Sequence, residues 1–568
     1  MRRNIIVGML AAIGLLAGSA VHAEMTDAGT CSALANKVTG LGDGVRLMSA
    51  SFVTQGTALK SSMGPSVTLP AHCDITGIMH ERAGLNGQAY AIRFHMRLPV
   101  KWNMRFVFQG GGGSNGDIGD AMGAGAGATS ALDQGYAVVS QDSGHDNAIN
   151  TDPAHNGQVA FGFDPVSRAD YGHTSLKVVA DTAKAIIRIY YGRGPLYSYF
   201  IGCSKGGQEG MTFATLYPDE FDGIIAGAPG FALPRAAVAE AWDVQSFGAL
   251  LKTSDSKPAN FMGLNATYSD ADMTLVRTAI LTACDKDDGL SDGIVGDYLA
   301  CSDDKVIPQL QAIACANAKT EACLSPAQIK ALVASHNGPV NSAGRSLYAG
   351  WFWPSGIAGN DWRLWKIGSS NGQVPALNVL LGGSSLASVF TTPPTVLGPN
   401  PQSYFEYQMA FDMDRDAPGI YAVQAPFTTS AWHDVGSRST DLSAFRRHGG
   451  KLMVPHGESD PVFSLKDTLD WYDAVNVRNG GKASLFARVF PVPGMCHCGG
   501  GQATSQYDAF GALVSWVEKQ QAPDYLLATA PEGSPWPERQ RPICAYPEVA
   551  RYKGTGNPEK ASSFSCKL

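Results

Sequence analysis

The distribution of apolar residues along the chain predicts strands and helices that alternate. Short runs rich in β-branched and aromatic residues predict strands at residues 90–98, 104–108, 136–140, 197–201, 221–226, 451–455 and 484–490. Apolar residues at helical spacing predict a helix over residues 176–191, and helices are also expected over residues 206–217 and 507–519. This alternation predicts an α/β fold built on a mostly parallel sheet.

The alternation stops after residue 230 and returns near residue 439. The intervening segment is rich in Trp, Pro and Ser, with scattered helical patterns and no run of alternating strands. A chain of 568 residues is also too long for one simple core. We therefore expect one α/β domain made of residues 24–230 and 439–568, interrupted by a second domain at 231–438. Such an insertion usually covers the carboxyl edge of the sheet, where ligands bind.

Residues 1–23 are typical of a secretory signal peptide. Arg2 and Arg3 precede an apolar stretch at 5–21, and small residues form a cleavage site before Glu24. The alternative is a membrane anchor, although the stretch is at the short limit for a membrane span. Removal of the segment takes away two arginines and no acid, and changes the formal net charge from −7 to about −9. No basic cluster remains, so we expect no nucleic acid or membrane partner. The signal peptide predicts a periplasmic or secreted protein, and we expect it to be a monomer.

The cysteine content supports export. Hydrophobic residues make up 44% and charged residues 16% of the chain, an ordinary globular composition. Eleven cysteines in an exported chain predict disulfides with one thiol left over. Zinc is the weaker interpretation, because the chain lacks a pair of C-x-x-C units.

The segment Gly202-Cys-Ser-Lys-Gly206 follows a predicted strand and precedes a predicted helix. This G-x-S-x-G pattern is typical of a sharp turn that projects a nucleophilic serine, here Ser204. We expect that a Cβ atom at Gly202 or Gly206 would collide with the neighbouring strand or helix. The alternative is a chance match, because the chain has 65 glycines.

A serine nucleophile needs a histidine base and an acid that orients it. In a sheet of this kind the chain order is serine, acid, histidine, with the acid just after a late strand. Asp460 fits this place, and Glu458 is a weaker alternative. His497 is the one histidine after Asp460, so it is the candidate base.

The tetrahedral intermediate of acyl transfer needs two backbone N–H donors. The amide of Lys205, directly after the nucleophile, is one candidate. The glycine run at 110–113 follows an early strand and supplies the other. A phosphate cradle is the competing interpretation, but no lysine with Ser or Thr follows the glycines.

Cys203 precedes the candidate nucleophile and Cys498 follows the candidate base. Because Ser204 and His497 must lie within hydrogen-bond reach, these two cysteines should also be close. A disulfide between them would restrict the motion of nucleophile and base. Cys496 could compete, but we expect it to be the unpaired thiol.

The segment Cys284-Asp-Lys-Asp-Asp-Gly-Leu-Ser-Asp-Gly-Ile294 is typical of a calcium loop. It departs from the EF-hand frame, because a glycine stands at the twelfth position where a glutamate is needed. Its carboxylates and backbone carbonyls could still form a shell of oxygen ligands. The expected ligands are Asp285, Asp288, Leu290, Asp292 and Ile294. The alternative is a solvated acidic turn.

With Cys203-Ser204, Asp460 and His497-Cys498 in place, the chain resembles the tannase and feruloyl esterase family over essentially its whole mature length. The resemblance implies an α/β-hydrolase fold, a lid at 231–438 and a structural Ca²⁺ at the acidic loop. It also implies an oxyanion role for Gly113 and aromatic substrate contacts from Trp365 and Phe463. The implied disulfides are Cys31–Cys73, Cys203–Cys498, Cys284–Cys301, Cys315–Cys323 and Cys544–Cys566.

The resemblance implies hydrolysis of small esters of aromatic carboxylic acids through an acyl-enzyme on Ser204. Members that act on terephthalate monoesters have a lid arginine that holds the free carboxylate; here Leu377 stands at that place and Leu381 replaces an aromatic residue. Arg363 is a candidate replacement for the lost cation. The alternatives are a hydrolase of galloyl esters and a non-catalytic aromatic-ligand binding protein of the same fold.

Overall fold

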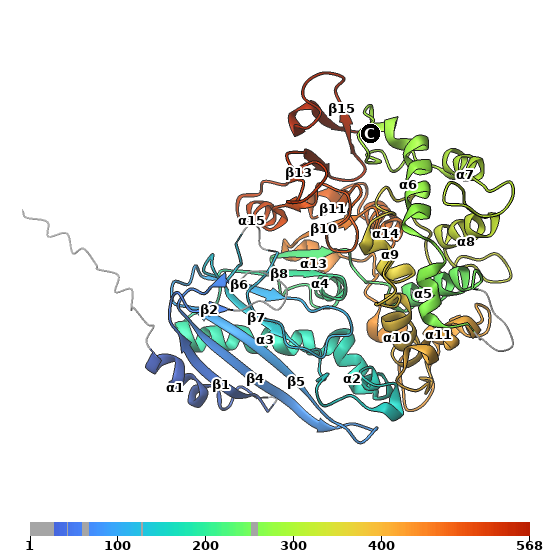
Figure 1. Cartoon of the computed structure of the whole chain (residues 1–568). Helices are drawn as coiled ribbons and strands as arrows, with labels where there is room; N and C mark the ends of the chain where they lie inside the picture. The colour runs from blue at the N-terminus through green and yellow to red at the C-terminus, as the bar shows by residue number, and fades with distance from the viewer. Residues whose placement is uncertain (1–27, 43, 60–66, 126–128, 252–258) are drawn as a thin grey trace, which may run out of the picture.

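The computed structural model describes residues 28–42, 44–59, 67–125, 129–251 and 259–568 (Figure 1). The expected signal peptide at 1–23 lies outside these residues. Among the residues described, no helix is both long and apolar enough to cross a bilayer.

A nine-stranded sheet forms the centre of the molecule. Its spatial order is β1 (Arg46–Val53), β4 (His72–Ala83), β5 (Ala89–Pro99), β7 (Ala137–Gln141), β6 (Arg105–Gln109), β8 (Tyr197–Cys203), β9 (Gly223–Gly227), β10 (Lys451–Gly457) and β11 (Ala487–Val492). The pairs from β1 to β7 are antiparallel. All pairs from β7 to β11 are parallel. The predicted mostly parallel α/β sheet is therefore confirmed, and its parallel part contains every predicted strand except β5.

Side chains of the parallel strands alternate between two buried layers, as the two-residue period of a strand requires. Phe106, Phe108 and Phe200 face α3 (Ser175–Tyr191) and α4 (Lys205–Leu216) on one side. Val107 and Tyr199 face the other side, in the cluster that includes α15 (Ala509–Lys519). Burial on both faces explains why these strands are apolar almost throughout.

Between β9 and β10 the named elements are helical, and no named strand occurs among the described residues of this segment. The α-helices are α5 (Leu233–Gly248), α6 (Asp270–Cys284), α7 (Asp303–Ala312), α8 (Pro326–Asn337), α9 (Asn360–Lys366), α10 (Ser384–Ser388), α11 (Pro401–Ala410), α12 (Ala431–Val435) and α13 (Ser443–His448). We call residues 231–438 the lid segment. Its status as a separate domain stays a prediction.

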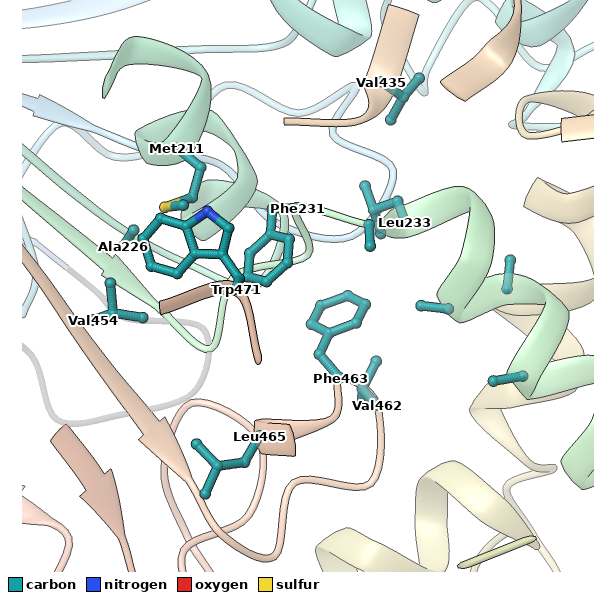
Figure 2. Packing of buried hydrophobic residues seen from close by; sticks show 14 of the residues in the cluster. Met211, Ala226, Phe231, Leu233, Val435, Val454, Val462, Phe463, Leu465 and Trp471 are labelled. Carbon is teal, nitrogen blue, oxygen red and sulfur yellow. The ribbon is translucent and has the colours of Figure 1, made fainter. Parts of the chain in front are cut away.

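The lid segment shares apolar core with the sheet layers. Figure 2 shows Phe463, from the loop after β10, facing Leu233 at the start of α5. The ring centroid of Phe231, just before α5, lies 5.8 Å from that of Trp471, which is part of α14 (Leu465–Arg478). The start of α5 is therefore fixed against the loop that carries the candidate acid.

The remaining α-helices and strands lie near the two ends of the chain, apart from one five-residue helix directly before the π-helical turn that leads into α3. They are α1 (Ala28–Val38), β2 (Ala58–Leu59), β3 (Val67–Thr68), α2 (Pro165–Ala169), β12 (Gln506–Tyr507), β13 (Tyr525–Thr529), β14 (Gln540–Cys544), β15 (Val549–Tyr552) and β16 (Phe564–Lys567). In Figure 1 the C-terminal strands β13 and β15 lie at the top, and β15 lies close to the end of α6. Arg551 of β15 donates to the carbonyl oxygen of Asp287, just beyond α6, at 3.1 Å.

Several predicted boundaries are wrong by one to three residues, and two of these differences have a clear physical cause. The strand expected at 484–490 begins only at Ala487, because residues 483–485 form a 3₁₀ turn whose first N–H donates to the side chain of Asn476. The helix expected at 507–519 begins at Ala509, because Tyr507 pairs with β13 and the Asp508 side chain caps the helix by accepting from Gly511 N–H.

Candidate active site

Ser204 stands at the sharp turn between β8 and α4. Its backbone has φ 66° and ψ −121°, a conformation that a residue with a side chain rarely adopts. A Cβ atom on Gly202 would lie 2.5 Å from the carbonyl oxygen of Gly206, and one on Gly206 would lie 2.7 Å from that of Gly111. The close approach expected of both glycines is confirmed, and the turn exposes the Ser204 hydroxyl at the carboxyl edge of the sheet.

His497 and Asp460 complete a chain of hydrogen bonds from Ser204. The distance from His497 Nε2 to Ser204 Oγ is 2.8 Å, and from His497 Nδ1 to Asp460 Oδ2 it is also 2.8 Å. Asp460 follows β10 and His497 follows β11, so the carboxyl ends of three parallel strands, β8, β10 and β11, bring together residues separated by up to 293 positions. This arrangement can deprotonate a serine hydroxyl and stabilise the imidazolium that results.

Asp460 is buried, and its other oxygen accepts hydrogen bonds from the N–H groups of Val462 at 2.8 Å and Phe463 at 3.1 Å. Burial by itself would raise the pKa of Asp460. The charge of His497 and hydrogen bonds from His456 and His497 outweigh burial and hold that pKa well below its usual range. Glu458, the weaker alternative, instead accepts from Ser459 Oγ and Gly494 N–H, and no hydrogen bond or ion pair among the described residues joins it to His497.

The structure forms all five disulfides that the resemblance implied. The Cα atoms of Cys203 and Cys498 lie 6.0 Å apart, so this bridge joins the neighbours of nucleophile and base directly. Cys496 is free and buried, as expected.

Gly113 and Lys205, the candidate oxyanion donors, both line the pocket at Ser204. The loop of Gly113 is held to α4 by Glu209, whose carboxylate accepts from Gly111 N–H at 2.9 Å and from Asn115 Nδ2 at 3.0 Å. Lys205 Nζ lies 3.0 Å from the same carboxylate. Glu209 thus connects the loop to the helix that carries the second donor.

Tyr171 adds a second connection. Its hydroxyl donates to the carbonyl oxygen of Gly113 at 3.3 Å, and Lys205 Nζ lies 4.5 Å from its ring centroid. Burial lowers the pKa of Lys205, and its pairing with Glu209 opposes that change. One signal for this network is visible in the sequence, namely the spacing of four residues between Lys205 and Glu209 on one helix.

The pocket walls come from the sheet loops and from the lid segment. Trp365 and Phe463, the expected aromatic contacts, both line the pocket, and their ring centroids lie 5.5 Å and 5.3 Å from that of His497. The full lining is Gly113, Ser114, Tyr171, Ser204, Lys205, Leu233, Ala237, Glu240, Trp365, Leu381, Gly382, Ser385, Phe390, Val462 and Phe463. Sequence reasoning missed the other polar and apolar lining residues, which are Ser114, Tyr171, Leu233, Ala237, Glu240, Gly382, Ser385, Phe390 and Val462.

Arg363 does not supply the cation missing from the lid. It is buried and donates to the carbonyl oxygens of Tyr268 at 2.9 Å and Asn265 at 2.5 Å. It is not among the pocket residues, and Leu377 is not either. Lys205 is the one cationic residue in that lining, and its ammonium group is paired with Glu209.

The acidic loop at 284–294 is closed by the Cys284–Cys301 bridge. Within the described ranges, no three His, Cys, Asp or Glu side chains lie close enough to hold a metal by themselves. Asp292 pairs with Arg541, whereas Asp285 and Asp288 have no ion pair among the described residues. Burial first, and then the charges of Asp292 and Asp285, raise the pKa of Asp288 to about 7. Carboxylate oxygens are hard donors, and Asp288 is buried near two further carboxylates, so these residue types fit the chemistry of Ca²⁺.

A family model described as tannase and feruloyl esterase matches residues 73–567. Mono(2-hydroxyethyl) terephthalate hydrolase of Piscinibacter sakaiensis is 42% identical over 525 residues, which cover 88% of this chain and 85% of that protein. A probable feruloyl esterase of Arthroderma benhamiae is 30% identical over 486 residues, which cover 83% of this chain and 81% of that protein.

Solved structures share the fold. Feruloyl esterase B from Aspergillus oryzae superimposes with a TM-score of 0.74 at 22% identity, over 95% of this chain and 100% of that chain. Tannin acyl hydrolase from Aspergillus niger gives a TM-score of 0.67 at 21% identity, over 95% of each chain.

Proposed function

The chain belongs to the tannase and feruloyl esterase family and is a carboxylic ester hydrolase with an α/β-hydrolase fold, and we propose that Ser204, His497 and Asp460 carry out the hydrolysis of aromatic esters. The observation that carries the proposal is the unbroken hydrogen-bond chain from Ser204 Oγ through His497 to Asp460. Aromatic side chains beside His497 favour an aromatic group next to the scissile ester.

In the first half of the reaction, Ser204 Oγ attacks the ester carbonyl carbon while His497 Nε2 takes the hydroxyl proton. The carbonyl oxygen becomes an anion, which the N–H groups of Gly113 and Lys205 would stabilise. When the intermediate collapses, His497 gives its proton to the leaving alcohol and the acyl group stays on Ser204.

In the second half, His497 takes a proton from water, whose oxygen attacks the acyl carbon. When the second tetrahedral intermediate collapses, the bond between Ser204 Oγ and the acyl carbon breaks, His497 gives its proton to Ser204 Oγ, and the aromatic acid is released. The negative charge of Asp460 stabilises the imidazolium in both halves and keeps Nε2 directed at the serine.

The substrate class follows from the charges in the pocket. A free carboxylate on the substrate needs a cation or several donors when it is buried. The ammonium group of Lys205, the cation of the lining, is already paired with Glu209. We therefore propose that esters of aromatic acids without a second, free carboxylate are better substrates than terephthalate monoesters.

The test combines labelling with kinetics. A fluorophosphonate should label the wild-type protein and not Ser204→Ala, and Ser204→Ala should lose ester hydrolysis while it keeps its circular dichroism spectrum. Methyl ferulate, methyl gallate and mono(2-hydroxyethyl) terephthalate should be compared by kcat/KM. Full activity of Ser204→Ala would contradict the assignment of the nucleophile, and an unlabelled, inactive wild type would indicate a binding protein.

We also propose that Asp285, Asp288 and Asp292, with the carbonyl oxygens of Leu290 and Ile294, hold a structural Ca²⁺. The ion would neutralise the carboxylates, which lie far along the chain from the triad. A chelator should lower the melting temperature, and added Ca²⁺ should restore it. An unchanged melting curve together with a metal-free elemental analysis of the purified protein would refute this proposal.

The five disulfides are typical of an oxidising compartment. Together with the signal-like residues 1–23, they support export to the periplasm or the medium.

A further inference from the structure

Glu240 is a buried carboxylic acid in the wall of the Ser204 pocket. It lies on α5 and is 7% exposed. No hydrogen bond or ion pair joins its carboxyl group to another residue in the part of the chain that the structure describes. Because a buried polar group without a partner costs free energy, this carboxyl group is a candidate for contact with a ligand.

The backbone opposite Glu240 is shaped to admit its carboxyl group. Gly382 lies in the π-helical turn Asn378–Gly383 of the lid segment and also lines the pocket. A Cβ atom on Gly382 would lie 2.0 Å from Glu240 Oε2. Any side chain at position 382 would therefore displace the carboxyl group from its present place.

Two cations bear on Glu240, Lys366 through its charge and Lys205 as a residue of the same pocket, and both are already paired. Lys366 of α9 pairs with Asp243, one turn along α5 from Glu240. Lys205 of α4 pairs with Glu209. Across the pocket, the hydroxyl of Tyr171 donates to a backbone carbonyl oxygen rather than to Glu240.

Burial is the main influence on this carboxyl group and raises the pKa of Glu240 to about 8; the charge of Lys366 opposes the rise and that of Asp243 adds to it. At neutral pH the group is therefore mostly protonated. A neutral carboxyl group offers one O–H donor and one carbonyl acceptor. A hydroxyl group on a ligand can use either.

We propose that Glu240 is a specificity-determining residue that hydrogen-bonds to a hydroxyl group on the aromatic ring of the substrate's acid. This inference rests on the proposed esterase function. A substrate without the hydroxyl leaves the carboxyl group buried and unpaired, and such a mismatch lowers kcat/KM. A substrate carboxylate at the same place would lie beside Glu240, which carries the same negative charge when it is ionised. Lys205 and Lys366 are already paired with other carboxylates, so neither offsets this repulsion.

The test measures a ratio of kcat/KM values. Methyl 4-hydroxycinnamate is compared with methyl cinnamate, and methyl 4-hydroxybenzoate with methyl benzoate, so that two ring positions are sampled. In the wild type we expect the hydroxylated member of at least one pair to be favoured about tenfold. Glu240→Leu should reduce that ratio to about one, and Glu240→Gln, which also donates and accepts, should keep most of it.

Gly382→Ala is an independent variant, because the added methyl group displaces the carboxyl group without removing it. It should lower the same ratio. A ratio that is unchanged in Glu240→Leu, or no preference for the hydroxyl in either wild-type pair, overturns the proposal. If the wild type hydrolyses none of the four esters, the esterase assignment itself has failed, which is a separate result.

A pH series supplies a readout that lost packing alone would not change. Monomethyl terephthalate carries a full negative charge from pH 6 to 9. As pH rises through about 8, Glu240 loses its proton, so the kcat/KM of this ester relative to methyl benzoate should fall in the wild type. Both esters are hydrolysed by the same triad, so an effect of pH on the triad cancels in the ratio. An equal fall in Glu240→Gln would contradict the role of Glu240.

Discussion

Asp460 and Glu458 lie two residues apart in the turn after β10, yet their environments give them different charges. Asp460 accepts from two backbone N–H groups and from His497. Glu458 is buried with fewer partners, and burial raises its pKa to about 7. A group that must stabilise an imidazolium near neutral pH has to be ionised, which favours Asp460 over Glu458.

Asp460→Asn should lower kcat by about 10³–10⁴-fold, because an amide removes the negative charge and can hold His497 in the wrong tautomer. The measurement is steady-state hydrolysis of methyl cinnamate, with the melting temperature as a check on folding. Glu458→Gln is the matched control and should change kcat by less than about tenfold. If the two variants reversed these effects, Glu458 would be the acid.

Single residues differed in how far their roles could be predicted from sequence. Ser204, Asp460 and His497 were predictable because chain order and strand ends constrain them, and one histidine was available. Glu209 and Glu240 were not. Their relevant neighbours, Gly111 and Gly382, are about 100 and 140 positions away in the chain, and no local pattern encodes such contacts.

At the scale of elements, α4 connects the nucleophile to the oxyanion loop. Its first residue, Lys205, supplies one candidate N–H donor, and Glu209 one turn later fixes the loop that supplies the other. The pair is almost fully buried, with side-chain exposures of 1% and 0%. A buried carboxylate with three donors is costly to disturb, so it holds its neighbours in fixed places.

Glu209→Gln should lower kcat by about 10–100-fold with little change in KM, because one loop donor loses its acceptor and the Gly113 amide moves from the developing oxyanion. Glu220→Gln is the control. Glu220 also pairs with lysines, Lys177 and Lys184, but outside the pocket. A parallel rise in KM for Glu209→Gln, or an equal loss of kcat in the control, would show that the effect is not one of oxyanion positioning.

Strands were predictable where both of their faces are buried. The apolar strands β6, β8 and β9 could be located to within about two residues, because both faces pack under helices. The longer β4 was missed. Its residues alternate between buried and half-exposed as far as Met79, but the last four, His80 to Ala83, are exposed or half-exposed and break the alternation. The order of the strands and the antiparallel edge depend on long-range pairing and do not follow from such patterns.

At the scale of the molecule, the lid segment is fastened to the layers around the central sheet by buried polar contacts as well as by apolar packing. Arg168 of α2 has a fully buried side chain and donates to Asp434 Oδ2 at 2.8 Å, Thr392 Oγ1 at 2.9 Å and the carbonyl oxygen of Thr429 at 2.8 Å. Its guanidinium also lies 3.9 Å from the ring centroid of Phe427. One arginine therefore holds residues from across the last fifty positions of the lid segment.

Arg168→Met should destabilise the protein by about 3–5 kcal/mol, because it leaves the carboxylate of Asp434 buried without its charge partner. The shift of the urea unfolding midpoint measures this loss. The double variant Arg168→Met/Asp434→Leu should recover part of it, since removing both charges is less costly than removing one.

The control for Arg168→Met is Arg46→Met, which breaks an ion pair whose two side chains are about half exposed. It should shift the midpoint very little, because water replaces the lost partner at such a site. A double variant that is less stable than Arg168→Met would mean that Asp434 stabilises the lid segment through contacts other than Arg168, such as the hydrogen bond that its carboxylate accepts from His433. A midpoint for Arg168→Met equal to that of Arg46→Met would mean that apolar packing alone fastens the lid segment to the sheet.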